Sequence, residues 1–166
     1  MASRVSLKNP AAQGGFSLIE MMVAVAIMAV LASMATPLYE LAVKRAKEQE
    51  LRTGLRQIRE AIDAYKRAVN DGRVARKAEE SEYPRKLEDL VDGVPDMKEP
   101  EKRKIYFLRR LPRDPMSDDP GLTDAGTWGK RAYESPPDSP QEGDDVFDVY
   151  SRSQEIGLNG IAYDKW

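Results

Sequence analysis

Residues 15–38 read GFSLIEMMVAVAIMAVLASMATPL, and no other part of the 166-residue chain is as apolar. Between Phe16 and Leu38 only Glu20 is charged, although 33% of all residues in the chain are charged. A helix of this length would extend about 34 Å, enough to cross a hydrocarbon core of about 30 Å. We therefore predict a membrane-spanning helix over residues 16–38.

The order of the N-terminal features differs from that of a secretory signal peptide. Such a peptide has an apolar region of about 7–15 residues followed by a small-residue cleavage site. Here Gly14 and Gly15 precede the apolar run, so cleavage after Gly15 would leave the membrane segment at the start of the mature chain. The new amino terminus at Phe16 would offer Glu20 a cationic partner, and the alternative is that this carboxylate reaches the lipid headgroups.

The composition excludes several kinds of catalytic and metal site. The chain contains no Cys and no His, which rules out disulfides, thiolate metal sites, Cys nucleophiles and every Ser-His-Asp arrangement. No glycine-rich phosphate-binding loop is present. We expect a protein that is not an enzyme. A membrane-tethered enzyme would have to rely on carboxylates, Lys, Ser or Tyr alone, and no pattern nominates a specific carboxylate.

Residues 39–72 are predicted to continue the helix in amphipathic form. The apolar positions recur with spacings of three and four residues, which places them on one face. The members of this stripe are Leu51, Leu55, Ile58, Ile62, Tyr65 and Val69, and the charged residues, Glu48 included, lie on the other faces. One helix from Phe16 to Val69 would be roughly 80 Å long. We expect Pro37 to kink or locally melt it, and Gly54 to weaken it slightly.

The stripe is predicted to pack against a small domain formed by residues 73–166; too few heptads are present to favour a coiled coil. Residues 73–81 are charged and predict a helix extension or a loop, and a short helix should end at Asp92-Gly93. Residues 131–133 and 146–150 read as short strands, and most of 112–143 as loops.

The N-terminal residues resemble a known family. Gly15-Phe16-Ser17-Leu18-Ile19-Glu20, the apolar run and Pro37 at its end are similar to the class III signal of type IV pilins and type II secretion pseudopilins. The resemblance implies that a prepilin peptidase removes the leader, residues 1–15, by cutting between Gly15 and Phe16. It also implies N-methylation of Phe16 and roles in assembly for Glu20 and Pro37.

Later residues narrow the resemblance to the major pseudopilins of type II secretion: Tyr83-Pro84, the stretch 111–115, Trp128-Gly129 and the terminal Trp166. It implies a pilin-like α+β fold, with the long helix packed on a small antiparallel sheet and a loop-rich C-terminal region. The expected function is that of a structural subunit anchored in the inner membrane, with its globular part in the periplasm. It would polymerise into a pseudopilus that drives export of folded proteins across the outer membrane.

The resemblance also implies partners: further copies of the chain, the prepilin peptidase, the inner-membrane secretion platform, minor pseudopilins, and membrane lipid before assembly. Two alternatives share residues 14–38, namely a type IV pilus subunit and a DNA-uptake pseudopilin. We expect no nucleic-acid binding, because acidic residues interrupt the basic helix face and no aromatic ladder accompanies it.

Major pseudopilins commonly bind calcium in their final loop, but this chain departs from that pattern. Residues 151–160 are short and lack the family's Asp-rich spacing. Oxygen ligands could come from Glu155, Asn159 or Asp164, yet we assign no metal site and no cofactor. The acidic residues at 118–119, 144–145 and 148 are predicted to be solvated loop groups.

The charges of the chain are distributed unevenly. Residues 39–113 carry 20 basic and 15 acidic side chains, whereas residues 114–166 carry 4 and 12. We hypothesise that the basic flank of one subunit meets the acidic flank of its neighbour, which would make assembly sensitive to salt. Charge counting alone, with only Arg4 and Lys8 in the leader, favours the topology opposite to the one that the resemblance implies.

Overall fold

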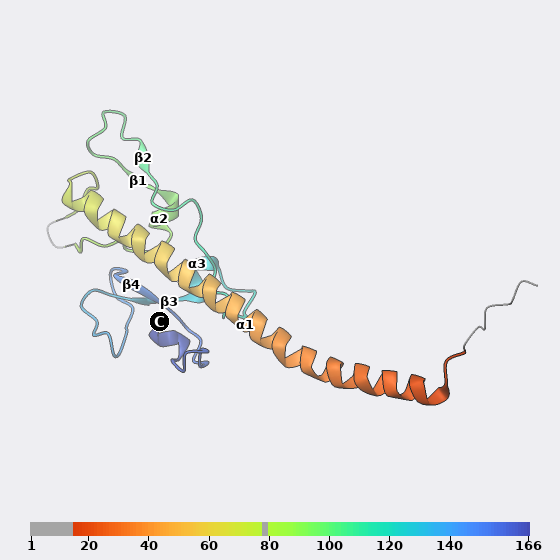
Figure 1. Ribbon diagram of the computed structural model, residues 1–166. Helices are drawn as coiled ribbons and strands as arrows, with labels where there is room; N and C mark the ends of the chain where they lie inside the picture. Colours follow the sequence, from red (N-terminus) through yellow and green to blue (C-terminus); the bar gives the residue numbers. More distant parts are fainter. Residues whose placement is uncertain (1–14, 78–79) are drawn as a thin grey trace, which may run out of the picture. The chain divides into compact units, whose positions relative to one another are not determined.

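The computed structural model describes residues 15–77 and 80–166, so the predicted leader lies outside the described residues except for Gly15. The chain divides into two compact units, with the boundary between Leu41 and Ala42. The elements follow in the order α1 (Leu18–Asn70), α2 (Asp89–Asp92), β1 (Val94–Pro95), β2 (Lys104–Ile105), α3 (Asp124–Thr127), β3 (Trp128–Arg131), β4 (Asp148–Ser151) and the 3₁₀ helix η1 (Tyr163–Lys165) (Figure 1).

Helix α1 confirms the long helix that the sequence predicts. It contains 53 residues and continues through Pro37, so the expectation of local melting is wrong. Proline removes one backbone hydrogen bond, yet helical structure is kept on both sides of Pro37. After Asn70 the chain turns at Gly72, whose φ of 68° is the left-handed conformation that commonly terminates helices. The described part of residues 73–81 is therefore a loop and not a helix extension.

In residues 15–77 and 80–166, two separate antiparallel pairs make up the sheet structure. Strand β1 pairs with β2, and β3 pairs with β4 so that Trp128 lies opposite Ser151. The predicted strands at 131–133 and 146–150 are therefore shifted along the sequence. The first corresponds to β3 over residues 128–131, and the second to β4 over residues 148–151. Val146 leaves the ladder because its backbone N–H donates to the carbonyl of Pro84.

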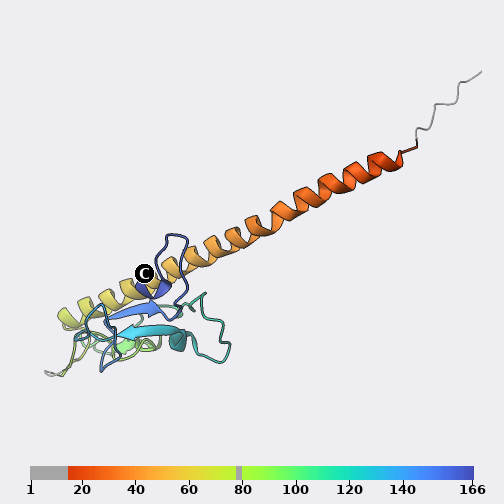
Figure 2. The ribbon, with the colours of Figure 1, turned by 90° about the horizontal axis from the view of Figure 1, so that it is seen from below.

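The core of unit 42–166 forms where the apolar stripe of α1 meets the later elements, which gather against one face of the helix (Figure 2). The first four stripe residues, from Leu51 to Ile62, are buried as predicted. They pack in one cluster with Leu87, Leu90, Trp128, Val146, Val149 and Tyr163. The fully buried Trp128 also donates its indole Nε1–H to the carbonyl of Pro112 at 2.8 Å. The structure therefore confirms the pilin-like α+β fold.

Candidate functional site

The first half of helix α1 presents an apolar surface. The large apolar side chains from Phe16 to Leu31 are 53–80% exposed in the single chain. A window of 18 residues in this helix has a mean hydropathy of 2.3 and no buried residue. Among the described residues, α1 is the one helix that is long and apolar enough to cross a membrane. Such a surface needs an apolar environment, and a single membrane anchor fits it.

The predicted processing residues lie just before this helix. Gly15, Phe16 and Ser17 precede the first residue of α1, and Gly15 and Phe16 are exposed. A Cβ atom added at Gly15 would meet no atom within 4 Å. The described residues therefore leave Gly15 and Phe16 exposed. Glu20 lies in the first turn of α1, where the helix dipole favours a negative charge.

Pro37 does not lie with the other predicted site residues. Gly15, Phe16 and Glu20 fall within six consecutive positions, whereas Pro37 follows Glu20 by 17 residues inside the same helix. That spacing corresponds to roughly 25 Å along a helix axis. The predicted residues therefore form one compact group at the start of α1 and one separate position, not a single site.

The acidic residues of the C-terminal region differ from the prediction of solvated loop groups. Asp145 is only 7% exposed and accepts a hydrogen bond from the backbone N–H of Tyr133 at 2.9 Å, so the prediction is wrong for this residue. Asp148 is half-buried and pairs with Arg59 at 2.7 Å. Asp144 is exposed as expected.

The other acidic pair, at 118–119, is exposed as predicted. The Asp119 carboxylate accepts the backbone N–H of Gly121 at 2.8 Å, which makes it part of a local turn. In residues 15–77 and 80–166, no three acidic side chains converge in a way that could hold a metal ion. Asp119, Asp145 and Asp148 thus serve local structure at separate places.

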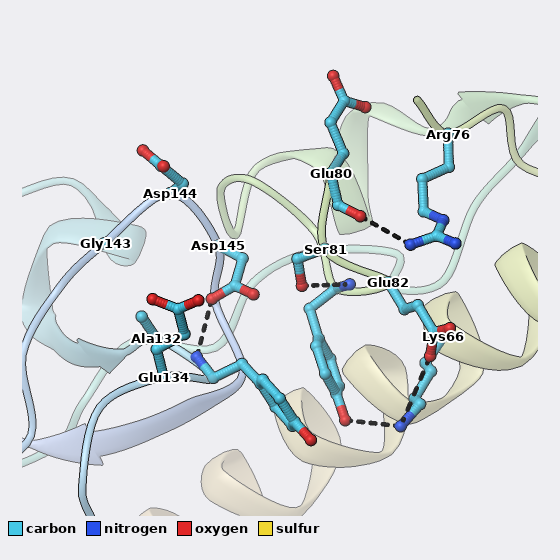
Figure 3. Close-up of a pocket in the computed structure, with 12 residues that line it drawn as sticks. Lys66, Arg76, Glu80, Ser81, Glu82, Ala132, Glu134, Gly143, Asp144 and Asp145 are labelled. Atoms are coloured by element: carbon cyan, nitrogen blue, oxygen red, sulfur yellow. Dashed lines mark hydrogen bonds and ion pairs between the residues drawn. The ribbon is translucent and has the colours of Figure 1, made fainter. Parts of the chain in front are cut away.

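A pocket lies beside the end of α1, between residues 80–83 and 132–145 (Figure 3). On one side Lys66 donates to the Tyr83 hydroxyl at 2.8 Å, and this hydrogen bond raises the pKa of Lys66. On the same side, a hydrogen bond from the backbone N–H of Lys77 holds the pKa of Glu80 below its usual value. Both shifts move these groups further from neutral pH, which is opposite to what proton transfer requires.

The basic face of α1 is in part bound to the chain's own C-terminal region. Arg59 donates to the Asp148 carboxylate, and also to the carbonyls of Val149 and Trp166 at 3.0 and 2.9 Å. The guanidinium of Arg52 lies 4.4 Å from the centre of the Trp166 ring, a cation–π distance. The basic and acidic flanks of the chain therefore already meet inside one molecule.

Sequence reasoning missed the position of Glu48, which was placed on the charged faces of the helix. The structure buries Glu48 to 5% exposure, and its Oε1 accepts hydrogen bonds from the Leu158 N–H at 2.7 Å and the Tyr163 hydroxyl at 3.0 Å. Burial, aided by the hydrogen bond to Glu48, raises the pKa of Tyr163 to about 12. A signal for this burial exists, because Glu48 precedes Leu51 by three residues and so continues the apolar stripe.

Comparisons with known proteins agree with the features of the N-terminal segment. Residues 10–36 match the family profile described as the prokaryotic N-terminal methylation motif. The chain is similar to type II secretion system core protein G of Klebsiella pneumoniae, with 31% identity over 81% of this chain and 92% of the relative. The protein of the same name from Dickeya chrysanthemi is 28% identical over 89% and 95%, and that of Vibrio cholerae 30% identical over 68% and 72%. No solved structure matches the chain significantly.

Proposed function

Because the chain belongs to the family of type II secretion system core protein G, the major pseudopilins, we propose that it is the repeating structural subunit of a pseudopilus. The precursor sits in the inner membrane through residues 16–38, loses residues 1–15 and is methylated at Phe16. Subunits then polymerise through their apolar helices, and the filament drives export of folded proteins across the outer membrane. The observation that carries this proposal is the exposed apolar half of α1, which begins at the methylation motif.

Glu20 has a specific role in this proposal. A carboxylate inside a membrane costs about 2.5–3.5 kcal/mol on insertion scales unless it is paired. Polymerisation would bring it to the cationic amino terminus at Phe16 of a neighbouring subunit, so that both charges are neutralised within the filament. Pro37, which stands inside the same helix, would mark the end of the membrane-embedded part.

The proposed orientation places the leader in the cytoplasm and residues 42–166 in the periplasm. The count of basic residues close to the span favours the opposite orientation, whereas long folded domains translocate largely regardless of their charge. Several of these cations are also partners within the domain: Lys44 donates to the Ile156 carbonyl, Arg59 pairs with Asp148, and Arg52 lies on Trp166.

Mass spectrometry of the mature N-terminus tests the proposal most directly. In a host that contains prepilin peptidase, we expect a chain that starts at Phe16 and carries one added methyl group. Replacing Gly15 with Val should block cleavage and leave the full precursor, with Gly14→Val as the matched control. An intact leader on the wild-type chain would contradict the proposal.

A secretion assay in a deletion strain then separates the proposed role from the two alternatives. If the deletion strain loses protein export and the wild-type chain restores it, the secretion role is supported. The names of the relatives favour this role. Long surface filaments in electron micrographs would instead favour a type IV pilus subunit. Salt-dependent DNA binding would favour DNA uptake.

A further inference from the structure

The C-terminal loop, residues 152–162, is attached to helix α1 by polar contacts. Lys44 and Glu48 lie one helical turn apart and so point from the same face. The Lys44 ammonium donates to the Ile156 carbonyl at 2.8 Å, and the Glu48 carboxylate accepts the Leu158 N–H at 2.7 Å. These contacts join residues more than a hundred positions apart in the sequence.

Apolar packing does not explain how this loop is held. The three largest apolar side chains of the loop, Ile156, Leu158 and Ile161, are 61%, 43% and 49% exposed. In contrast, Glu48 and the Tyr163 that follows the loop are almost completely buried, and they are joined by a hydrogen bond of 3.0 Å. Loss of Glu48 would leave a buried hydroxyl and a backbone N–H without their acceptor, which costs more than an exposed contact.

The oxygen atoms of this loop do not fit the calcium ion that the pseudopilin family implies. Calcium takes six to eight oxygen ligands. Here the Asn159 side-chain oxygen accepts the Ile161 N–H at 3.0 Å, and the Glu155 carbonyl accepts the Tyr163 N–H at 3.0 Å. The Ile156 carbonyl already faces the Lys44 ammonium, whose charge would repel a second cation.

A hydrogen bond across the loop and the carboxylate of Asp164 also determine how few oxygen atoms could bind calcium. Gly157 and Ile161 bond each other across the loop, from the N–H of the first to the carbonyl of the second at 2.9 Å. The carboxylate of Asp164 has one buried oxygen, Oδ1, without a hydrogen-bond partner among the residues that the structure describes. A single such oxygen supplies only a small part of a calcium coordination shell.

We infer that Lys44 and Glu48 form a clamp that closes the C-terminal loop without a metal ion. Lys44 supplies the positive charge that a cation would bring to the loop carbonyls, and Glu48 supplies the acceptor for the loop N–H and the Tyr163 hydroxyl. This inference concerns the subunit itself and does not rest on the proposed function.

Thermal unfolding and amide hydrogen exchange of the full chain in detergent micelles test the clamp. We expect the Tm of the wild-type chain to be unchanged by calcium up to about 1 mM, the range used by weak extracellular modules, and by a calcium chelator. Glu48→Ala should speed exchange of the Leu158 amide by about tenfold or more, and calcium should not restore it. Glu48→Gln, which keeps an acceptor oxygen, should recover part of the protection.

Lys44→Met provides a second variant that keeps the apolar stem and removes the charge; it should loosen the loop less severely than Glu48→Ala. The matched controls are Glu50→Ala and Lys47→Met, because both residues are exposed on the same helix. Calcium that raises the Tm of the wild-type chain, or terbium luminescence sensitised by Trp166, would overturn the inference. Unchanged Leu158 exchange in both clamp variants would overturn it as well. If Glu48→Ala does not fold, Lys44→Met and the metal titrations still decide the question.

Discussion

The two halves of helix α1 use apolar residues in opposite ways. In the first half, every large apolar side chain from Phe16 to Leu31 is more than half exposed. In the second half, Leu51 and Ile58 are fully buried against the chain's own domain, and charged residues cover the other faces. One continuous helix therefore contains an exposed apolar surface in its first half and, in its second half, an apolar surface that is buried against the chain's own domain.

This difference indicates that assembly and folding depend on separate residues. Burying apolar area stabilises whichever state buries it. For the second half that state is the folded domain, whereas for the first half it is the membrane or the proposed filament. Substitutions in the two halves should therefore affect different measurements.

The largest expected effect comes from Glu20. We predict that Glu20→Ala abolishes filaments, because the amino terminus of the neighbouring subunit would lose its partner in an apolar environment. The cost of about 3 kcal/mol for each subunit contact corresponds to roughly a hundredfold in association. Electron microscopy and cross-linking in cells would measure the loss. Urea unfolding of the domain should stay unchanged, and Glu50→Ala in the second half serves as control. Wild-type filaments in the Glu20 variant would remove the distinction between the two halves.

The same side-chain change in each half gives the sharpest comparison. Ile58→Ala should lower the free energy of unfolding by about 2–5 kcal/mol, since Ile58 is fully buried. Ile27→Ala removes the same atoms from a side chain that is 55% exposed. It should change the free energy of unfolding by less than about 0.5 kcal/mol. Urea titration followed by Trp128 fluorescence would measure both. Equal effects would mean that the first half also packs on the domain.

The success of sequence reasoning differs between local and distant features. The span of α1 and its buried stripe were predictable because both depend on periodicity within one segment. Glu48 continues the apolar stripe, but it was misplaced because the partners that satisfy its buried carboxylate, Leu158 and Tyr163, lie about 110 positions away. The boundaries of β3 and β4 shifted for the same reason, since pairing partners outside the local pattern end each ladder.

The candidate site shows the same division. The proposed processing residues and Glu20 are predicted from one short motif, whereas no local pattern predicts the contacts that tie the basic helix face to the C-terminal region. The hypothesis that the basic flank of one subunit meets the acidic flank of its neighbour assumes that the charges of both flanks have no partners within their own chain. Arg59 and Asp148 already neutralise each other within the chain, so only the remaining exposed charges can set contacts between subunits.

A smaller effect is expected at Gly54, where helix propensity and packing oppose each other. A Cβ atom here would lie 3.3 Å from the Trp128 ring, which is fully buried and held by its hydrogen bond to Pro112. Gly54→Ala gains about 1 kcal/mol of propensity, but the crowding of a fixed ring costs about 1–3 kcal/mol. We predict net destabilisation of about 1 kcal/mol, measured by urea unfolding. In a Trp128→Leu background the same change should become neutral or stabilising, and the absence of such coupling would contradict the packing argument.

The smallest expected effect is the pH dependence of the pair formed by Arg73 and Asp96, which ties the loop after α1 to the segment after β1. Arg73 Nη2 lies 2.6 Å from the nearly buried Asp96 carboxylate, and the Lys98 backbone N–H donates to the other oxygen. Mainly through the hydrogen bond from Arg73, these contacts hold the pKa of Asp96 below its ordinary value of 3.8.

A lowered pKa in the folded state means that the pair stabilises the domain above the ordinary value, and that this stability is lost as the pH falls through the folded value. We therefore expect Asp96→Asn to lower the Tm at about pH 7, with the difference from wild type shrinking towards about pH 3. Asp138→Asn, which changes an exposed carboxylate, should show no such difference at either pH. Because the Arg73–Asp96 pair lies wholly within residues 42–166 and Asp96 is buried, Asp96→Asn should not alter filament formation. A change in assembly would show that the two halves of α1 are coupled after all.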